Sequence, residues 1–101
     1  MANAIFFCSF KLNEGKAVQD FLSAAEELNN GFISKQKGYV SWKQVVDGSN
    51  WADIVTFETM EDAHAFLEAA ETPNELSTKF FSFVDLASTK VHVFSVEKEY
   101  K

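Results

Sequence analysis

The pattern of hydrophobic and polar residues divides the chain into four segments that favour strands and three that favour helices. The strand segments are rich in aromatic and β-branched residues and contain no proline. The helical segments carry apolar residues three and four positions apart, which places those residues on one face. We expect strands over residues 4–12, 39–46, 51–57 and 89–96, and helices over about 14–29, over about 60–70 and after Asn74.

Residues with known preferences for helix starts and turns mark the boundaries between these segments. Asn13, Thr59 and Asn74 each precede a helical segment and offer a side-chain oxygen to the N–H groups of its first turn. Residues 47–50, Asp-Gly-Ser-Asn, favour the turn of an antiparallel hairpin. Residues 85–88 are expected to form a loop. The first helix should bury one apolar stripe, formed by Val18, Phe21, Leu22, Ala25 and Leu28.

The order of these segments predicts an α+β fold of the ferredoxin-like type, βαββαβ, with a short extra helix before the last strand. The chain is too short to form two separate cores, so residues 1–101 should be a single domain. Right-handed crossovers would place the first and third strands in the centre of an antiparallel sheet, with the helices on one face. The second and fourth strands carry more polar residues, as edge strands can, namely Lys43, Gln44, Lys90 and His92.

Both faces of the central strands are apolar. The first strand offers Phe6, Cys8 and Phe10 to one face, and Ile5 and Phe7 to the other. A sheet covered by helices on one side would normally alternate apolar and polar residues. A second copy of the same sheet is the simplest cover for the other face, which predicts a homodimer. The alternative is a monomer that presents an aromatic face to a different partner.

Composition and charge narrow the classes of partner. The net charge is −6 and no lysine or arginine cluster offsets it, so we expect no binding to nucleic acid. The apolar runs are too short for a signal peptide or a membrane span, which predicts a cytoplasmic protein that does not enter a membrane. Eleven phenylalanines are more than a small core readily buries, so some should line a pocket or an interface. Cys8, the only cysteine, is expected to be a small buried residue rather than a nucleophile.

Two ionisable residues are candidates for chemistry. Asp53 interrupts the apolar third strand, where an unpaired charge would be unfavourable, so it should pair with Lys43 across the hairpin or point into a polar cavity. It is either a structural partner or a functional carboxylate. His64 lies about 110° from the centre of the apolar stripe of the second helix. It is either a general base reaching into a cavity or a partly solvated boundary residue.

The aromatic residues around the hairpin form a second group of candidates. Tyr39, Trp42 and Trp51 combine an apolar body with a polar tip, which suits a ligand wall, a dimer contact or the core. His64 and His92 lie far apart and lack a metal-binding spacing, so we expect no metal site. The sequence also has no Ser-His-Asp spacing and no phosphate-binding glycine loop.

Three stretches carry a resemblance to a known family: Gly-Tyr-Val-Ser-Trp at 38–42, Trp-Ala-Asp-Ile-Val-Thr-Phe-Glu-Thr at 51–59 and Met-Glu-Asp-Ala at 60–63. With the aromatic short helix, they resemble the dimeric α/β-barrel superfamily, specifically its antibiotic-biosynthesis-monooxygenase-like branch. The resemblance is one of fold and pattern over nearly the whole chain. It implies a homodimer with packed sheets and a ligand cavity between sheet and helices. Some members oxidise aromatic substrates with O₂ and no metal or flavin, and others degrade haem.

The residues used by haem-degrading members do not carry over. Those members have an asparagine on the first strand, a tryptophan on the third and a histidine from the second half of the chain. Here Asn3 lies at the outer end of the first strand, and Phe57 stands where the tryptophan would be expected. Trp51 is at the opposite end of its strand, and His64 comes earlier than a haem ligand would. We expect no haem and no other cofactor.

Two functions follow from these observations. The first is a homodimer that binds a small apolar or aromatic molecule between sheet and helices and acts as a cofactor-independent monooxygenase, with His64 or Asp53 as the base. Its cavity walls would be formed by Tyr39, Trp42, Trp51, Phe57 and Phe66. The alternative is a non-catalytic dimeric binding or interaction module whose aromatic residues serve only the core and the interface.

Overall fold

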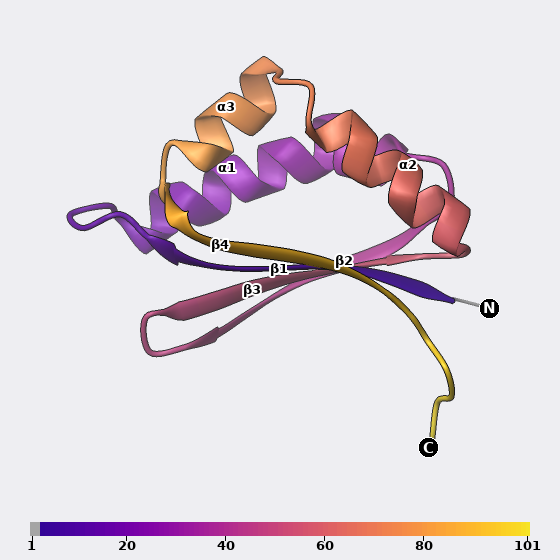
Figure 1. Cartoon of the computed structure of the whole chain (residues 1–101). Helices are drawn as coiled ribbons and strands as arrows, with labels where there is room; N and C mark the ends of the chain where they lie inside the picture. The colour runs from indigo at the N-terminus through magenta and orange to yellow at the C-terminus, as the bar shows by residue number, and fades with distance from the viewer. Residues whose placement is uncertain (1–2) are drawn as a thin grey trace.

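The computed structural model describes residues 3–101 and consists of a four-stranded sheet with all its helices on one face (Figure 1). The strands are β1 (Ala4–Leu12), β2 (Tyr39–Asp47), β3 (Asn50–Phe57) and β4 (Val84–Ser95). The helices are α1 (Val18–Gly31), α2 (Met60–Ala70) and α3 (Glu75–Phe81), with a short 3₁₀ turn, η1 (Ile33–Lys35), after α1. Within residues 3–101, no helix has the length and apolar character that crossing a membrane requires.

The strand order is β2-β3-β1-β4, and every neighbouring pair is antiparallel. The two apolar strands, β1 and β3, therefore lie in the centre and the more polar strands lie at the edges. The predicted α+β ferredoxin-like fold and the short helix before the last strand are confirmed.

The caps of α2 and α3 form as predicted. The Thr59 hydroxyl accepts a hydrogen bond from the backbone N–H of Asp62 at 3.0 Å. Asn74 and Ser77 bond reciprocally, because Asn74 Oδ1 accepts from the Ser77 N–H at 2.9 Å while the Asn74 N–H donates to Ser77 Oγ at 3.0 Å. Such side-chain caps satisfy N–H groups that have no partner inside the helix.

The start of α1 differs from the prediction. The helix begins at Val18, and the capping position is Ala17, which makes no side-chain hydrogen bond. Asn13 instead donates its side-chain amide to the carbonyls of Ser82 and Val84, both at 3.3 Å. The side-chain amide of Asn13 thus ties the end of β1 to the start of β4, and Asn13 lies four positions before the capping position of α1.

The start of β4 also differs, because the expected loop at 85–88 belongs to the strand. Leu12 pairs with Val84 and Lys11 pairs with Asp85, after a shift in register between Ser9 and Lys11. At that irregularity the backbone N–H of Lys11 donates to Ser88 Oγ at 2.8 Å. A side-chain hydroxyl thus replaces a backbone partner, which lets the edge strand continue through a stretch whose polar composition favours a loop.

The buried stripe of α1 is narrower than predicted. Val18 and Leu22 are 47% and 43% exposed, so including them was wrong. The buried positions, three and four residues apart, are Phe21, Ala24, Ala25 and Leu28. Ala24 is small enough for α1 to lie close to the layer beneath it. The core between helices and sheet is centred on Phe21, which is fully buried.

The opposite face of the sheet is not covered by any element of residues 3–101 (Figure 1). The registers of the four strands place three rows of side chains on this open face. From β4 to β2 the rows are Phe94-Ile5-Thr56-Ser41, His92-Phe7-Ile54-Lys43 and Lys90-Ser9-Ala52-Val45. The centre of the open face is therefore apolar, as the sequence predicted, and Phe94 is 49% exposed there.

Candidate functional site

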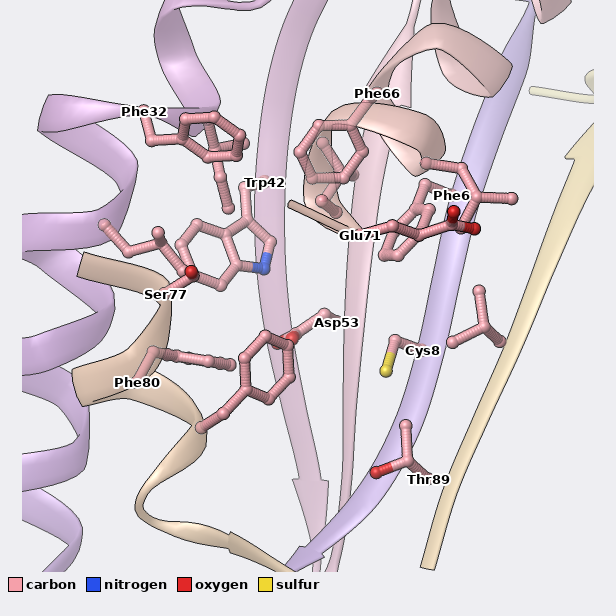
Figure 2. Close-up of a pocket in the computed structure, with 17 residues that line it drawn as sticks. Phe6, Cys8, Phe32, Trp42, Asp53, Phe66, Glu71, Ser77, Phe80 and Thr89 are labelled. Atoms are coloured by element: carbon pink, nitrogen blue, oxygen red, sulfur yellow. The ribbon is translucent and has the colours of Figure 1, made fainter. Parts of the chain in front are cut away.

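A cavity of about 210 Å³ lies between the helix-covered face of the sheet and the three helices (Figure 2). A cavity of roughly 150 Å³ can hold a benzene molecule, so this one has room for a slightly larger aromatic molecule. Its wall is mostly apolar and includes six aromatic rings, from four elements and the segment after α1: Phe6, Phe32, Trp42, Phe66, Phe80 and Phe81. Side chains on β1, β2, β3, β4, α1, α2 and α3 contribute to it, so the cavity forms only when the whole fold is assembled.

Edge-to-face contacts hold the rings of the wall in place. Phe6 of β1 contacts Phe66 of α2 with ring centroids 4.9 Å apart, and Trp42 of β2 contacts Phe80 of α3 at 6.0 Å. Such perpendicular contacts are favourable because the positive edge of one ring meets the negative face of the other. The two pairs join sheet to helices on different sides of the cavity (Figure 2).

Asp53 of β3 is the buried carboxyl of this cavity, with 6% of its surface exposed. Burial raises its pKa from 3.8 to about 7, although a hydrogen bond from Gln44 favours the charged form. Gln44 Nε2 donates to Asp53 Oδ1 at 3.1 Å. In the part of the chain that the structure describes, no lysine, arginine or histidine lines the cavity. Near neutral pH the carboxyl is therefore populated in both forms and can either donate or accept a proton.

The partner of Asp53 is set by the register of the hairpin. Gln44 lies directly opposite Asp53, whereas Lys43 lies opposite Ile54 and therefore on the open face. Asp53 therefore does not pair with Lys43, and it lies in a cavity as the alternative expected, but the wall of this cavity is mostly apolar rather than polar.

Two further polar atoms in the cavity wall are buried without a hydrogen-bond partner, Trp42 Nε1 and Thr89 Oγ1. The Trp42 N–H is near enough to Asp53 to lower the carboxyl's pKa, but it does not reach hydrogen-bond geometry. An unpaired buried polar atom destabilises a fold by about 1–3 kcal/mol, so these two atoms are positioned to gain from a ligand oxygen. No sequence pattern pointed to Thr89, because threonine is common in strands and this one stood at the start of the strand predicted over 89–96.

Cys8 lies opposite Asp53 on β1 and also lines the cavity. It is buried, as predicted. Burial, and secondarily the charge of Asp53, raises the pKa of its thiol to about 12. A thiol in this state remains protonated, so Cys8 forms part of the apolar wall.

The candidate wall residues separate into two groups. Trp42 and Phe66 line the cavity, while Tyr39, Trp51 and Phe57 are not among its lining residues. Trp51 packs on Phe21 with ring centroids 5.2 Å apart.

The other two aromatic residues outside the lining have structural contacts instead. The Tyr39 hydroxyl donates to Asn29 Oδ1 at 3.1 Å, which joins β2 to α1. Phe57 is fully buried and packs on Tyr39 and Phe66 with ring centroids 6.5 and 5.3 Å away.

The two histidines are both outside the cavity. His64 is exposed on α2, because its neighbour Ala63 faces the sheet and the next helical position turns about 100° away from it. Its assignment as a base stays a prediction without support from this geometry. His92 lies on the open face, where its ring stacks on that of Phe94 at 5.4 Å.

The charges around the cavity bear on which ligands it could hold. Among the described residues 3–101, the carboxylates in its wall are Asp53 and Glu71, and no lysine, arginine or histidine lies there to neutralise a phosphate. Within residues 3–101, no three side chains of His, Cys, Asp or Glu are grouped as a metal site would require. The arrangement therefore favours an uncharged aromatic ligand over a phosphorylated one.

Comparisons with known proteins give similarity in structure only. No protein-family model matches the chain, and no curated protein sequence does. Among solved structures, SnoaB, a cofactor-independent oxygenase of Streptomyces nogalater, aligns with a TM-score of 0.73 and 15% identity over 96% of this chain and 95% of that one. A candidate antibiotic biosynthesis monooxygenase of Bordetella bronchiseptica aligns with a TM-score of 0.69 and 12% identity over 100% of both chains.

A third solved structure, a protein of unknown function from Nitrosomonas europaea, has a TM-score of 0.67 and 19% identity over 100% of this chain and 95% of that one. Together these neighbours confirm the predicted resemblance at the level of fold, because the chain shares the α+β ferredoxin-like fold of solved structures that include a candidate antibiotic biosynthesis monooxygenase. At such low identities the residues of the site have to carry any functional argument.

Proposed function

We propose that the protein binds a small uncharged aromatic molecule in the cavity beneath its helices and catalyses a cofactor-independent oxidation of it, with Asp53 as the base. The observation that carries this proposal is a carboxyl of raised pKa, buried in an aromatic cavity beside two polar atoms that have no partner. A buried ionisable group with a shifted pKa in a cavity is typical of a catalytic site.

The chemistry follows from the groups in the wall. An aromatic ligand would pack among the rings, and its oxygen would accept a hydrogen bond from the Trp42 N–H and contact the Thr89 hydroxyl. The Asp53 carboxylate would take a proton from the ligand, leaving an electron-rich anion that reacts directly with O₂ as co-substrate. The structural neighbour SnoaB is a cofactor-independent oxygenase, which supports this class of reaction.

The alternative, a non-catalytic module whose aromatic residues serve only core and interface, needs a helix–sheet layer that is packed solid. The cavity, with Asp53 in its wall, favours ligand binding over that alternative. The ligand-binding and catalytic parts of the proposal can be separated by experiment.

Binding is tested with 1-naphthol as the probe in isothermal titration calorimetry. The substitution Trp42→Phe keeps an aromatic ring but removes the N–H, and is expected to weaken binding about 5- to 10-fold, the loss of one hydrogen bond. Trp51→Phe is the matched control, because Trp51 is not in the cavity wall, and its affinity should equal that of the wild type. Equal affinities of all three proteins, or no binding of naphthol, would contradict the proposed site.

Catalysis is tested by oxygen uptake with electron-rich hydroxyaromatic compounds. Asp53→Asn should lower the rate about 100-fold or more while naphthol binding persists, because the amide cannot accept the proton. His64→Ala should leave the rate unchanged, since His64 is exposed outside the cavity. Full activity of Asp53→Asn would exclude Asp53 as the base.

We also propose that two copies of the chain pair through their open faces. Packing one sheet on another buries a partly exposed apolar layer that includes Phe94, Phe7 and Ile54. Light scattering at micromolar concentration should therefore give twice the mass of the chain. A monomer under those conditions would overturn the pairing.

A further inference from the structure

We propose that the ring of Phe81 divides the cavity from a second, outer pocket and thereby limits the ligand to a compact aromatic molecule. The proposal rests on the ligand binding proposed above and deepens it, because it names the residue that sets the upper size of the ligand.

The outer pocket is the first observation. It lies on the surface, over the end of α2, α3 and the first part of β4, and its volume is about 480 Å³. Its lining includes Pro73, between α2 and α3, and Leu86 of β4, which is 64% exposed. Within residues 3–101, no charged side chain lines this pocket. Its surface therefore suits an apolar group.

Three side chains line both the cavity and the outer pocket, namely Ala70, Ser77 and Phe81. A side chain that lines two spaces lies between them, so these three residues form the partition. Ala70 contributes only a methyl group, and the Ser77 hydroxyl is held in the cap of α3 by hydrogen bonds with the backbone of Asn74. Phe81 is the only large residue of the three, so its ring makes up most of the partition.

The two phenylalanines at the end of α3 have different surroundings. Phe80 is 2% exposed, and its ring lies 5.1 Å from that of Phe21 and 6.0 Å from that of Trp42, so it belongs to the core. Phe81 is the next residue, turned about 100° around the helix, and is only half-buried. Its ring meets that of Phe80 edge to face at 5.2 Å. Phe81 can therefore be shortened with a smaller loss of stability than a core ring.

Other walls of the cavity adjoin pockets that carry charge. Phe32 lines the cavity and a surface pocket that includes Glu75, and Trp42 lines the cavity and a groove that includes Glu26. An apolar group is buried most favourably where no charge has to leave water. An apolar extension of the ligand would therefore pass the wall at Phe81.

The experiment compares 1-naphthol with 4-hexylphenol, which carries a six-carbon chain beyond its ring, by isothermal titration calorimetry. Phe81→Ala should bind 4-hexylphenol about 10-fold or more tightly than the wild type does, because the alkyl chain gains the apolar outer pocket. Its affinity for 1-naphthol should change by less than about 3-fold, because this compact ligand needs only the cavity.

Leu86→Asp tests the path that the chain takes. Leu86 lines the outer pocket but not the cavity, so a charge there should remove the gain of Phe81→Ala for 4-hexylphenol and leave 1-naphthol binding unchanged. Phe32→Ala is the matched control, because it shortens a ring in a different wall. Adding Leu86→Asp to Phe32→Ala should change neither affinity.

Circular dichroism checks that each variant is folded, and Phe81→Leu, with a smaller gain, gives the measurement if the alanine protein is not. Equal affinities of wild type and Phe81→Ala for 4-hexylphenol, or a gain that Leu86→Asp does not remove, would overturn the partition. Binding of 1-naphthol by the wild type would then still support the proposed site. A wild type that binds no 1-naphthol would overturn the proposed function, and the partition with it.

Discussion

Replacing Phe21 by alanine is expected to lower the free energy of unfolding by about 3–5 kcal/mol. Phe21 is fully buried, and its ring lies 5.1 Å from that of Phe80 and 5.2 Å from that of Trp51. Phe10 and Phe83 complete the surroundings at 5.8 and 6.1 Å. Rings from α1, α3 and two strands meet here, so no single element can move in to close the gap.

Urea unfolding at fixed protein concentration measures this effect. Leu22→Ala is the matched control, because Leu22 is the next residue of α1 and is 43% exposed, and it should lose less than about 1 kcal/mol. Small domains are stable by only about 5–15 kcal/mol, so the alanine protein could be largely unfolded. In that case Phe21→Leu, with a smaller loss, gives the measurement. Similar losses at Phe21 and Leu22 would contradict the assignment of Phe21 to the centre of the core.

The stability of the wild-type protein is expected to fall as the pH rises from about 4 to about 7, because of Asp53. In the unfolded chain this carboxyl loses its proton near its ordinary pKa of 3.8, whereas in the folded protein it keeps the proton until about pH 7. Between these values the folded state binds one more proton than the unfolded state, so raising the pH favours unfolding. The pKa difference corresponds to about 4 kcal/mol, lost in full above pH 7.

Asp53→Asn should remove this dependence, because an amide does not titrate in that range. Unfolding by urea at pH 5 and at pH 8 should show a large difference in stability for the wild type and a much smaller one for the asparagine protein. Asp20→Asn, on α1, is the control and should keep the wild-type difference. The Cys8 thiol stays protonated over the whole range, so it does not contribute. Equal pH dependence of wild type and Asp53→Asn would show that Asp53 is not the titrating group.

Phe21 and Asp53 are expected to affect the stability of the layer around the cavity in opposite directions. Phe21 stabilises the layer between sheet and helices, while ionised Asp53 weakens it at neutral pH. A buried acid that lowers stability at neutral pH is what a stability–activity trade-off predicts for a functional residue. Asp53→Asn is therefore expected to be more stable than the wild type at pH 8 and to lack its oxidative activity.

The preference of certain residues for helix caps predicted the structure correctly where the side chain had only neighbouring backbone groups as partners. Thr59 and Asn74 cap their helices because the nearest unpaired N–H groups belong to the turn that follows. Asn13 also precedes a predicted helix and was expected to cap it. Its side-chain amide instead donates to backbone carbonyls about seventy residues away in the sequence. Only the antiparallel pairing of β1 with β4 brings those carbonyls within reach. The same pairing extends β4 through residues whose polar character favours a loop.

The sequence by itself determined the order of strands and helices, the central position of β1 and β3, and the alternation of side chains between the two faces of these central strands. These features follow from periods of 2 and 3.6 residues and from turn chemistry, which act over a few neighbouring positions. Tertiary structure alone decided that Trp42 and Phe66 line the cavity, that Trp51 packs on Phe21, and that His64 faces outward. Periodicity tells which side chains point toward the helices, but the gap that remains unfilled depends on how three helices of different length pack over the same sheet.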